Sequence, residues 1–205
     1  MDPHTIATLA ELEALYARPA APSLAKEVDY LHPHYRAFVE AAPLCLLSTV
    51  GKDVAECSPR GDAPGFVQVL DERTLLMPDR RGNNRIDSLR NIVADPRVGL
   101  LFLIPGINET LRINGTARIS VAPDLLARCE VEGKTPVSVL VIHVQAVFFQ
   151  CARALLRSRV WDAGSRRPRN SLPSNGEILA ALSRNAIDGE AYDRELPERL
   201  RTTLY

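Results

Sequence analysis

The chain has 205 residues, of which 46% are hydrophobic, so it can bury one substantial core but is short for two full domains. Lysine and arginine together number 25, and so do aspartate and glutamate, which leaves a net charge near zero at pH 7. This balance excludes the overall basic field that holds nucleic acid or an anionic membrane, so any binding of phosphate has to be local.

No part of the sequence resembles a signal for export or a segment that spans a membrane. The N-terminal residues have neither the basic start nor the apolar run of a signal peptide, and the longest apolar runs have the length of buried strands. The cysteines show no C-x-x-C spacing, and His32 and His34 lack an evident third ligand. We therefore expect a cytoplasmic protein with reduced thiols and no metal site.

The first forty residues are expected to be helical. Leu9, Leu12 and Leu15 recur at helical spacing within residues 5–17. A second helix is expected to begin with Ser23 as its cap, and a third covers residues 35–41. We predict that residues 1–40 form an N-terminal helical extension.

Mainly strands are expected from residue 41 to residue 161, which we predict to form one domain. The expected strands are 44–50, 54–57, 67–70, 74–77, 98–104, 110–119 and 137–147. The expected helices are 84–93, 123–129 and 148–156. Because strand and helix do not alternate one by one, this order favours an antiparallel β-barrel with helices outside it.

The end of the chain, residues 162–205, is expected to form a loop followed by a short helix at 177–184. Pro168 and Pro173 make the first part of this segment loop-like. We predict that the segment packs on the barrel or on a partner subunit.

Two turns that contain glycine and arginine follow neighbouring strands. They are SPRGDAPGF at 58–66 and PDRRGNNR at 78–85. The second turn leads directly into a helix, so main-chain N–H groups at the helix start, with Arg80 and Arg85, form a candidate phosphate site. The alternative is a pair of solvated loops whose arginines have Asp62 or Asp79 as partners.

Arg112 lies within an otherwise apolar strand. Alternation along a strand places Thr110, Arg112 and Asn114 on one face, which therefore cannot be pure core. An arginine there requires an anionic partner, because burial of an isolated charge is very costly. A nearby carboxylate such as Glu109 would satisfy it, and so would a bound anion.

Many segments, in the same order, resemble the FMN-binding split barrel of the pyridoxamine 5′-phosphate oxidase superfamily. They are LLST at 46–49, SPRGD at 58–62, LLMPDR at 75–80, GNNR at 82–85, SLRNI at 88–92 and DPRVGLLF at 95–102. The sequence is similar to an uncharacterised FMN-dependent branch that continues with LIPG at 103–106, TLRING at 110–115, CARAL at 151–155 and RSRVW at 157–161. The resemblance implies a mainly β fold, an antiparallel split β-barrel with N-terminal and peripheral helices.

The resemblance also implies a homodimer with FMN in clefts at the subunit interface. Two strands would run along the isoalloxazine ring, and their contact residues correspond to Ser58, Pro59, Arg60, Gly61, Met77, Pro78 and Asp79. The phosphate would be bound at the start of the following helix by Arg80, Asn83, Asn84 and Arg85. A facing strand would contribute Thr110 and Arg112, and the partner subunit would contribute Arg157, Ser158 and Trp161. Trp161 is equally well explained as an interface anchor without cofactor contact.

The function that the resemblance implies is that of an FMN-dependent oxidoreductase acting on a small molecule. A flavin carries the electrons while the protein binds and orients it, so no catalytic acid or base can be singled out. The alternatives are a non-catalytic flavin-binding protein for storage or redox sensing, and a barrel that holds a deazaflavin or heme instead. The chain departs from the family in two places: it lacks the Arg-x-His signature that grips the vitamin substrate, and Gln150 stands where close relatives tend to have histidine.

Overall fold

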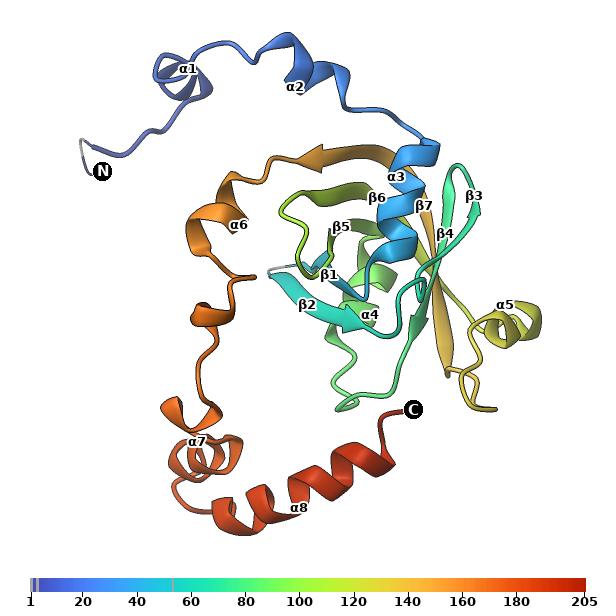
Figure 1. Ribbon diagram of the computed structural model, residues 1–205, viewed down its shortest axis with the longest axis vertical. Coiled ribbons are helices and arrows are strands. Elements are labelled where there is room, and N and C mark those ends of the chain that lie inside the picture. The colour runs from blue at the N-terminus through green and yellow to red at the C-terminus, as the bar shows by residue number, and fades with distance from the viewer. Residues whose placement is uncertain (1, 3, 53) are drawn as a thin grey trace.

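The computed structural model describes residues 2, 4–52 and 54–205. Seven antiparallel strands form one sheet in the order β2-β1-β5-β6-β7-β4-β3, which curls around the main hydrophobic core (Figure 1). The strands are β1 (Leu44–Val50), β2 (Ala55–Gly61), β3 (Gln68–Asp71), β4 (Thr74–Asp79), β5 (Arg97–Leu103), β6 (Thr110–Ser120) and β7 (Ser138–Gln150). The predicted antiparallel split barrel with helices outside it is confirmed.

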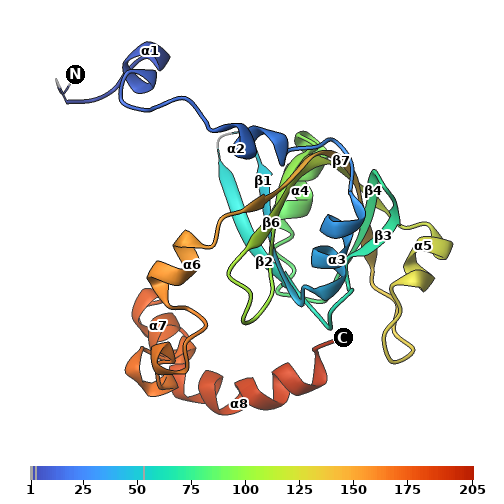
Figure 2. The ribbon, with the colours of Figure 1, turned by 45° about the horizontal axis from the view of Figure 1, so that its top comes forward.

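The helices are α1 (Leu9–Glu13), α2 (Ala21–Ala25), α3 (Pro33–Ala41), α4 (Asp87–Ala94), α5 (Pro123–Arg128), α6 (Arg153–Ser158), α7 (Asn175–Leu182) and α8 (Gly189–Thr202). Short 3-10 turns lie at Ala163–Ser165 and Arg169–Ser171. Helix α3 packs against the barrel, whereas α1 and α2 extend away from it (Figures 1 and 2). Within the described residues, no helix combines the length and the apolar character that crossing a membrane requires.

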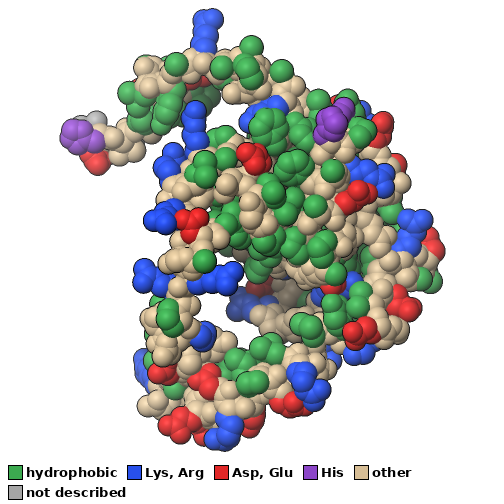
Figure 3. Space-filling model, viewed as in Figure 1, with side chains coloured by type: hydrophobic (Ala, Val, Ile, Leu, Met, Phe, Trp, Pro, Cys, Tyr) green, Lys and Arg blue, Asp and Glu red, His purple; other side chains and the backbone are tan. Residues whose placement is uncertain are grey.

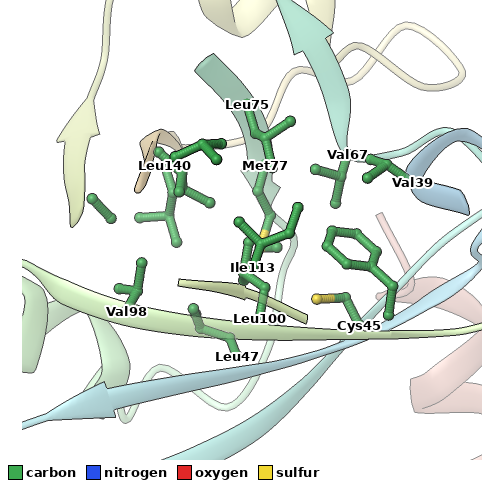
Figure 4. Packing of buried hydrophobic residues seen from close by; sticks show 14 of the residues in the cluster. Val39, Cys45, Leu47, Val67, Leu75, Met77, Val98, Leu100, Ile113 and Leu140 are labelled. Carbon is green, nitrogen blue, oxygen red and sulfur yellow. The ribbon is translucent and has the colours of Figure 1, made fainter. Parts of the chain in front are cut away.

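The core lies inside the curled sheet and is built by alternation along the strands. On β1, Cys45 and Leu47 point inward, and on β5 and β6 the inward residues include Leu100 and Ile113 (Figure 4). Met77 from β4 also lies in this cluster and is fully buried. Full burial of each such side chain contributes roughly 1.5–3 kcal/mol, so the barrel is the stable centre of the molecule.

Several element boundaries differ from the sequence prediction. The helix expected at 5–17 shortens to α1, none of whose residues is buried, so its apolar face gains nothing from packing. The second helix begins at Ala21, with Pro22 in its first turn and without Ser23 as its cap. The third begins earlier than predicted, at Pro33.

In the second half of the chain, one predicted helix is wrong at its start and one helix was not predicted. The helix expected to start at residue 148 does not, because β7 continues to Gln150 and pairs Phe148 with Arg112 on β6. Helix α6 begins only at Arg153. The sequence also gave no sign of α8, a polar helix of 14 residues with Pro197 inside it and no buried residue.

Residues 151–205, which we call the C-terminal arm, leave the barrel at the end of β7 and arch away from it. Within the arm, α7 and α8 pack on each other. The chain returns to the barrel at Tyr205, beside the loops that follow β2 and β4 (Figures 1 and 2). Figure 3 shows open space between the arm and the barrel. The predicted boundaries at residues 40 and 161 stay predictions.

Candidate binding cavity

A cavity of about 1120 Å³ opens beside β2, where β4 ends and α4 begins. The loop at 134–138 and the side chain of Tyr205 form its far wall. The residues predicted for the flavin site that line this cavity are Ser58, Pro59, Arg60, Gly61, Asp79, Arg80, Asn83, Asn84 and Arg85. The fold thus brings the two glycine-containing turns together on one cavity.

Strand β2 presents polar side chains to the cavity because it is an edge strand with alternating exposure. Glu56, Ser58 and Arg60 are half-buried on the cavity side, and the residues between them are exposed. Pro59 can occupy the middle of this strand because only β1 pairs with β2 among the described strands.

A hydrogen-bond network centred on Glu56 joins β2 to α4. Its Oε1 atom accepts hydrogen bonds from Ser58 Oγ (2.5 Å) and Ser88 Oγ (3.2 Å), and Oε2 accepts one from Asn91 Nδ2 (3.4 Å). Ser88 Oγ in turn accepts from Arg60 Nη2 at 3.0 Å. Sequence reasoning missed Glu56, although its alternation with Ser58 and Arg60 places it on the same face.

Arg60 is half-buried and lines the cavity without an ion-pair partner among the described residues. Its guanidinium donates to the main-chain oxygen of Pro59 (3.0 Å) and to Ser88 Oγ (3.0 Å), which are both neutral groups. No described carboxylate lies within ion-pair distance of it. A guanidinium in such a place favours an anionic ligand.

Arg80, by contrast, is already paired. Its Nε atom donates to Asp62 Oδ2 at 2.7 Å and its Nη1 atom to the main-chain oxygen of Cys129 at 2.8 Å. The two side chains are only 17% and 3% exposed. Burial alone would raise the pKa of Asp62, but hydrogen bonds from Tyr205, the N–H of Ala63 and Arg80 lower it below the usual value. This pair fixes the loop after β2 to the end of β4.

Arg85 lies in the open turn before α4. It donates to Asp87 Oδ2 at 2.8 Å, with both side chains well exposed, so this ion pair contributes little. Asn84 and Ile86 have positive φ angles of 58° and 52°, which a right-handed helix does not allow. The helix predicted to begin at residue 84 therefore begins only at Asp87. No side chain caps the start of α4, so its first main-chain N–H groups have no side-chain partner. They lie at the turn that lines the cavity.

Asp79 contributes a carboxylate to the cavity wall. Burial raises the pKa of this carboxyl group, and the charge of Arg60 partly opposes the shift. Among the residues that the structure describes, none donates a hydrogen bond to it. It is therefore the carboxylate of the cavity that is least stabilised by the protein itself.

The remaining predicted site residues do not line the cavity of this chain. Met77 and Pro78 are buried behind it. The others lie elsewhere and are Thr110, Arg112, Arg157, Ser158 and Trp161. Trp161 donates its indole N–H to the main-chain oxygen of Ile107 at 2.9 Å, which ties the start of the arm to the loop between β5 and β6.

Arg112 is exposed on the outside of the sheet. Its guanidinium lies 5.5 Å from the ring centroid of Phe148, and no ion pair joins it to Glu109 in the part of the chain that the structure describes. We call the surface around it the outer face, formed by Leu44, Leu46, Leu101, Leu103 and Arg112. Between β1 and β5, Leu44 pairs with Leu103 and Leu46 pairs with Leu101. Between β5 and β6, Leu101 pairs with Arg112. Its leucines are only partly buried.

The sequence was also compared with known proteins. The model of the pyridoxamine 5′-phosphate oxidase family matches residues 31–151. No curated protein matches the sequence. Among solved structures, HupZ from Group A Streptococcus is 18% identical, with a TM-score of 0.47 over 58% of this chain and 92% of that one. The FAD binding protein from Mycobacterium smegmatis is 13% identical, with a TM-score of 0.42 over 60% and 97%.

Proposed function

This chain belongs to the pyridoxamine 5′-phosphate oxidase family, and from that membership we propose that it is a flavoprotein, an FMN-dependent oxidoreductase that acts on a small molecule. The cavity beside β2 is the proposed FMN site. When bound, the flavin would supply the transfer of hydride or electrons, and the protein would supply binding and orientation.

The observation that carries this proposal is that Arg60 lines the cavity with no ion-pair partner among the described residues. It faces a cavity whose wall also holds Arg85, Asn83 and the uncapped start of α4. A dianionic phosphate matches these donors, since guanidinium groups and free main-chain N–H groups are its usual ligands. Arg85 can exchange its exposed partner Asp87 for phosphate at small cost.

The size and the walls of the cavity also fit a flavin. At about 1120 Å³ it lies at the upper end of small-molecule sites, which typically measure about 300–1,000 Å³, so a substrate has space beside the cofactor. Phe66 and Pro136 provide apolar surface for a planar ring. In the proposed site, Arg60, which the resemblance places beside the ring, takes the phosphate together with the 83–85 turn, because Arg80 is already bonded to Asp62. The rest of β2 and the end of β4 orient the ring.

We propose that the protein works as a homodimer with FMN at the subunit interface. The partly exposed leucines of the outer face support this proposal, because apolar residues clustered on a sheet face favour contact with a partner. Arg112 lies on that face and is free of ion pairs among the described residues, so it is available to a ligand held by the second copy. Arg157, Ser158 and Trp161 would approach the cofactor in the same way.

Titration of FMN into the purified protein, followed by quenching of flavin fluorescence, tests the proposed site. We expect wild type to bind and Arg60→Ala to bind about 10–100-fold more weakly, which corresponds to one or two charge-assisted hydrogen bonds. Arg97→Ala is the matched control, because Arg97 is an exposed arginine paired with Asp95 and does not line the cavity. Absent binding, or equal affinity of the two variants, would contradict the proposal.

Reduction by NADH or NADPH tests the enzymatic part of the proposal. An oxidoreductase that uses either donor loses its flavin colour when the donor is added without oxygen. A protein that binds FMN and keeps its colour with both donors would instead support the non-catalytic flavin-binding function.

A further inference from the structure

Tyr205 connects the C-terminal arm to the wall of the cavity. Its hydroxyl donates to Asp62 Oδ1 at 2.7 Å, and its ring centroid lies 5.5 Å from the guanidinium carbon of Arg80. Lys134 Nζ lies 3.5 Å from the main-chain oxygen of Tyr205. The hydrogen bond to Asp62 raises the pKa of Tyr205, so the hydroxyl stays protonated and remains a donor.

The pair that receives Tyr205 is complete without it. Arg80 already bonds to Asp62 and to the Cys129 main-chain oxygen, and the N–H of Ala63 bonds to Asp62 Oδ1 at 2.7 Å. Asp62 and Arg80 therefore form a fixed receptor, and Tyr205 can leave it without breaking the barrel.

The two helices of the arm before Tyr205, α7 and α8, pack tightly on each other. Gly176 and Gly189 bring α7 and α8 so close that a Cβ atom on Gly176 would lie 2.0 Å from the main-chain oxygen of Gly189. Asp193 on α8 accepts hydrogen bonds from Ser174 Oγ and from the N–H of Gly176 (2.8 Å). Helix α8 has no buried residue. Apart from its packing on α7, the contact of Tyr205 with the barrel is what holds the C-terminal end of α8 in place.

We infer that Tyr205 is a latch, a positioning residue that closes the C-terminal arm against the cavity, and that a bound ligand enters and leaves when this latch opens. The ring of Tyr205 forms part of the wall when the latch is closed. For the identity of the ligand, FMN, this inference rests on the proposed function, but the closed state of the arm is a property of the ligand-free chain.

Limited trypsin digestion of the ligand-free protein measures the latch directly, since α8 carries the exposed sites Arg194, Arg199 and Arg201. We expect Tyr205→Phe to be cleaved in α8 a few-fold faster than wild type and Tyr205→Ala about tenfold faster, the factor for a hydrogen bond to a charged group. The control is Tyr192→Phe, which removes a hydroxyl from the same helix at a tyrosine that contacts Arg199 and not the barrel.

The rate of FMN dissociation is the second readout. We expect Tyr205→Ala to release FMN about tenfold faster, by the same factor for the lost hydrogen bond, whereas Arg60→Ala should release it faster without any change in digestion of α8. Digestion and release that match the Tyr192→Phe control in both Tyr205 variants would overturn the latch. If wild type fails to bind FMN, the proposed function falls, and digestion alone decides whether Tyr205 holds the arm.

Discussion

Arg60, Arg80 and Arg85 lie in two similar turns of the sequence but in three different electrostatic environments. Arg80 is held by a buried carboxylate, Arg85 by an exposed one, and Arg60 only by neutral oxygens. The sequence predicted that arginines gather at these turns, and all three line the cavity. Which of them lacks an ion-pair partner among the described residues depends on tertiary neighbours such as Ser88, and no local pattern encodes that.

Asp79 leads to a prediction about stability. Because burial raises the pKa of this carboxyl group in the folded state, the ionised form destabilises the ligand-free protein at neutral pH. We expect Asp79→Asn to be more stable than wild type at pH 7 by roughly 0.5 kcal/mol, because the carboxyl group is only half-buried and solvent screens its charge.

The sign of this effect sets its pH dependence. As the pH falls through the raised pKa, wild-type Asp79 becomes neutral and the difference between the two proteins should disappear. Urea denaturation of both proteins at pH 7 and near pH 4 measures it. A variant that is less stable than wild type at pH 7 would show that the carboxylate has a favourable partner.

At the scale of elements, the central strands could be predicted from the sequence, but several helix limits could not. Residues 148–150 have helical periodicity with the residues that follow, yet pairing with Thr110 to Arg112 on β6 keeps them in β7. Helix α8 escaped prediction because it is polar and buries no residue, so it lacks the apolar repeat from which helices are recognised. A local sequence pattern reveals neither the pairing of strands that are distant in the chain nor a polar helix that buries no residue.

Gly115 on β6 gives a prediction at this scale. The pairing register of β6 and β7 shifts between Asn114 and Gly115, and there an added Cβ would lie 2.0 Å from the main-chain oxygen of His143. Because main-chain atoms between central strands cannot move aside, we expect Gly115→Ala to cost about 3 kcal/mol of unfolding free energy. Gly164→Ala is the control, with open space around the added methyl group. Equal denaturation midpoints for the two variants would disprove the steric argument.

At the scale of the whole molecule, the proposed dimer would explain why some predicted site residues lie outside the cavity of one chain. The cavity gathers the predicted residues of β2, β4 and the 83–85 turn, whereas Thr110, Arg112 and the arm residues lie outside it. A single sequence shows which segments belong to a family site, but it does not show which subunit supplies each of them. The partner contribution therefore stays a prediction.

Leu101 tests the assembly, because it lies in the outer face between Leu46 and Arg112. We expect Leu101→Glu to shift the protein from dimer to monomer in analytical ultracentrifugation, because the new carboxylate, even when paired with Arg112 on the neighbouring strand, would have to leave water at an apolar interface. Its FMN affinity should fall as well, by about tenfold or more if a charged hydrogen bond comes from the second copy. Val121→Glu, at an exposed position just before α5, should remain a dimer. A dimeric Leu101→Glu variant would refute the role of this face.

The absorption spectrum of the freshly purified protein tests the central claim most directly, because it reports what the cavity holds. The account predicts the bands of an oxidised flavin, and a released compound with the mass of FMN after denaturation. A colourless protein that does not bind added FMN would contradict it, and so would the spectrum of a heme or of a deazaflavin.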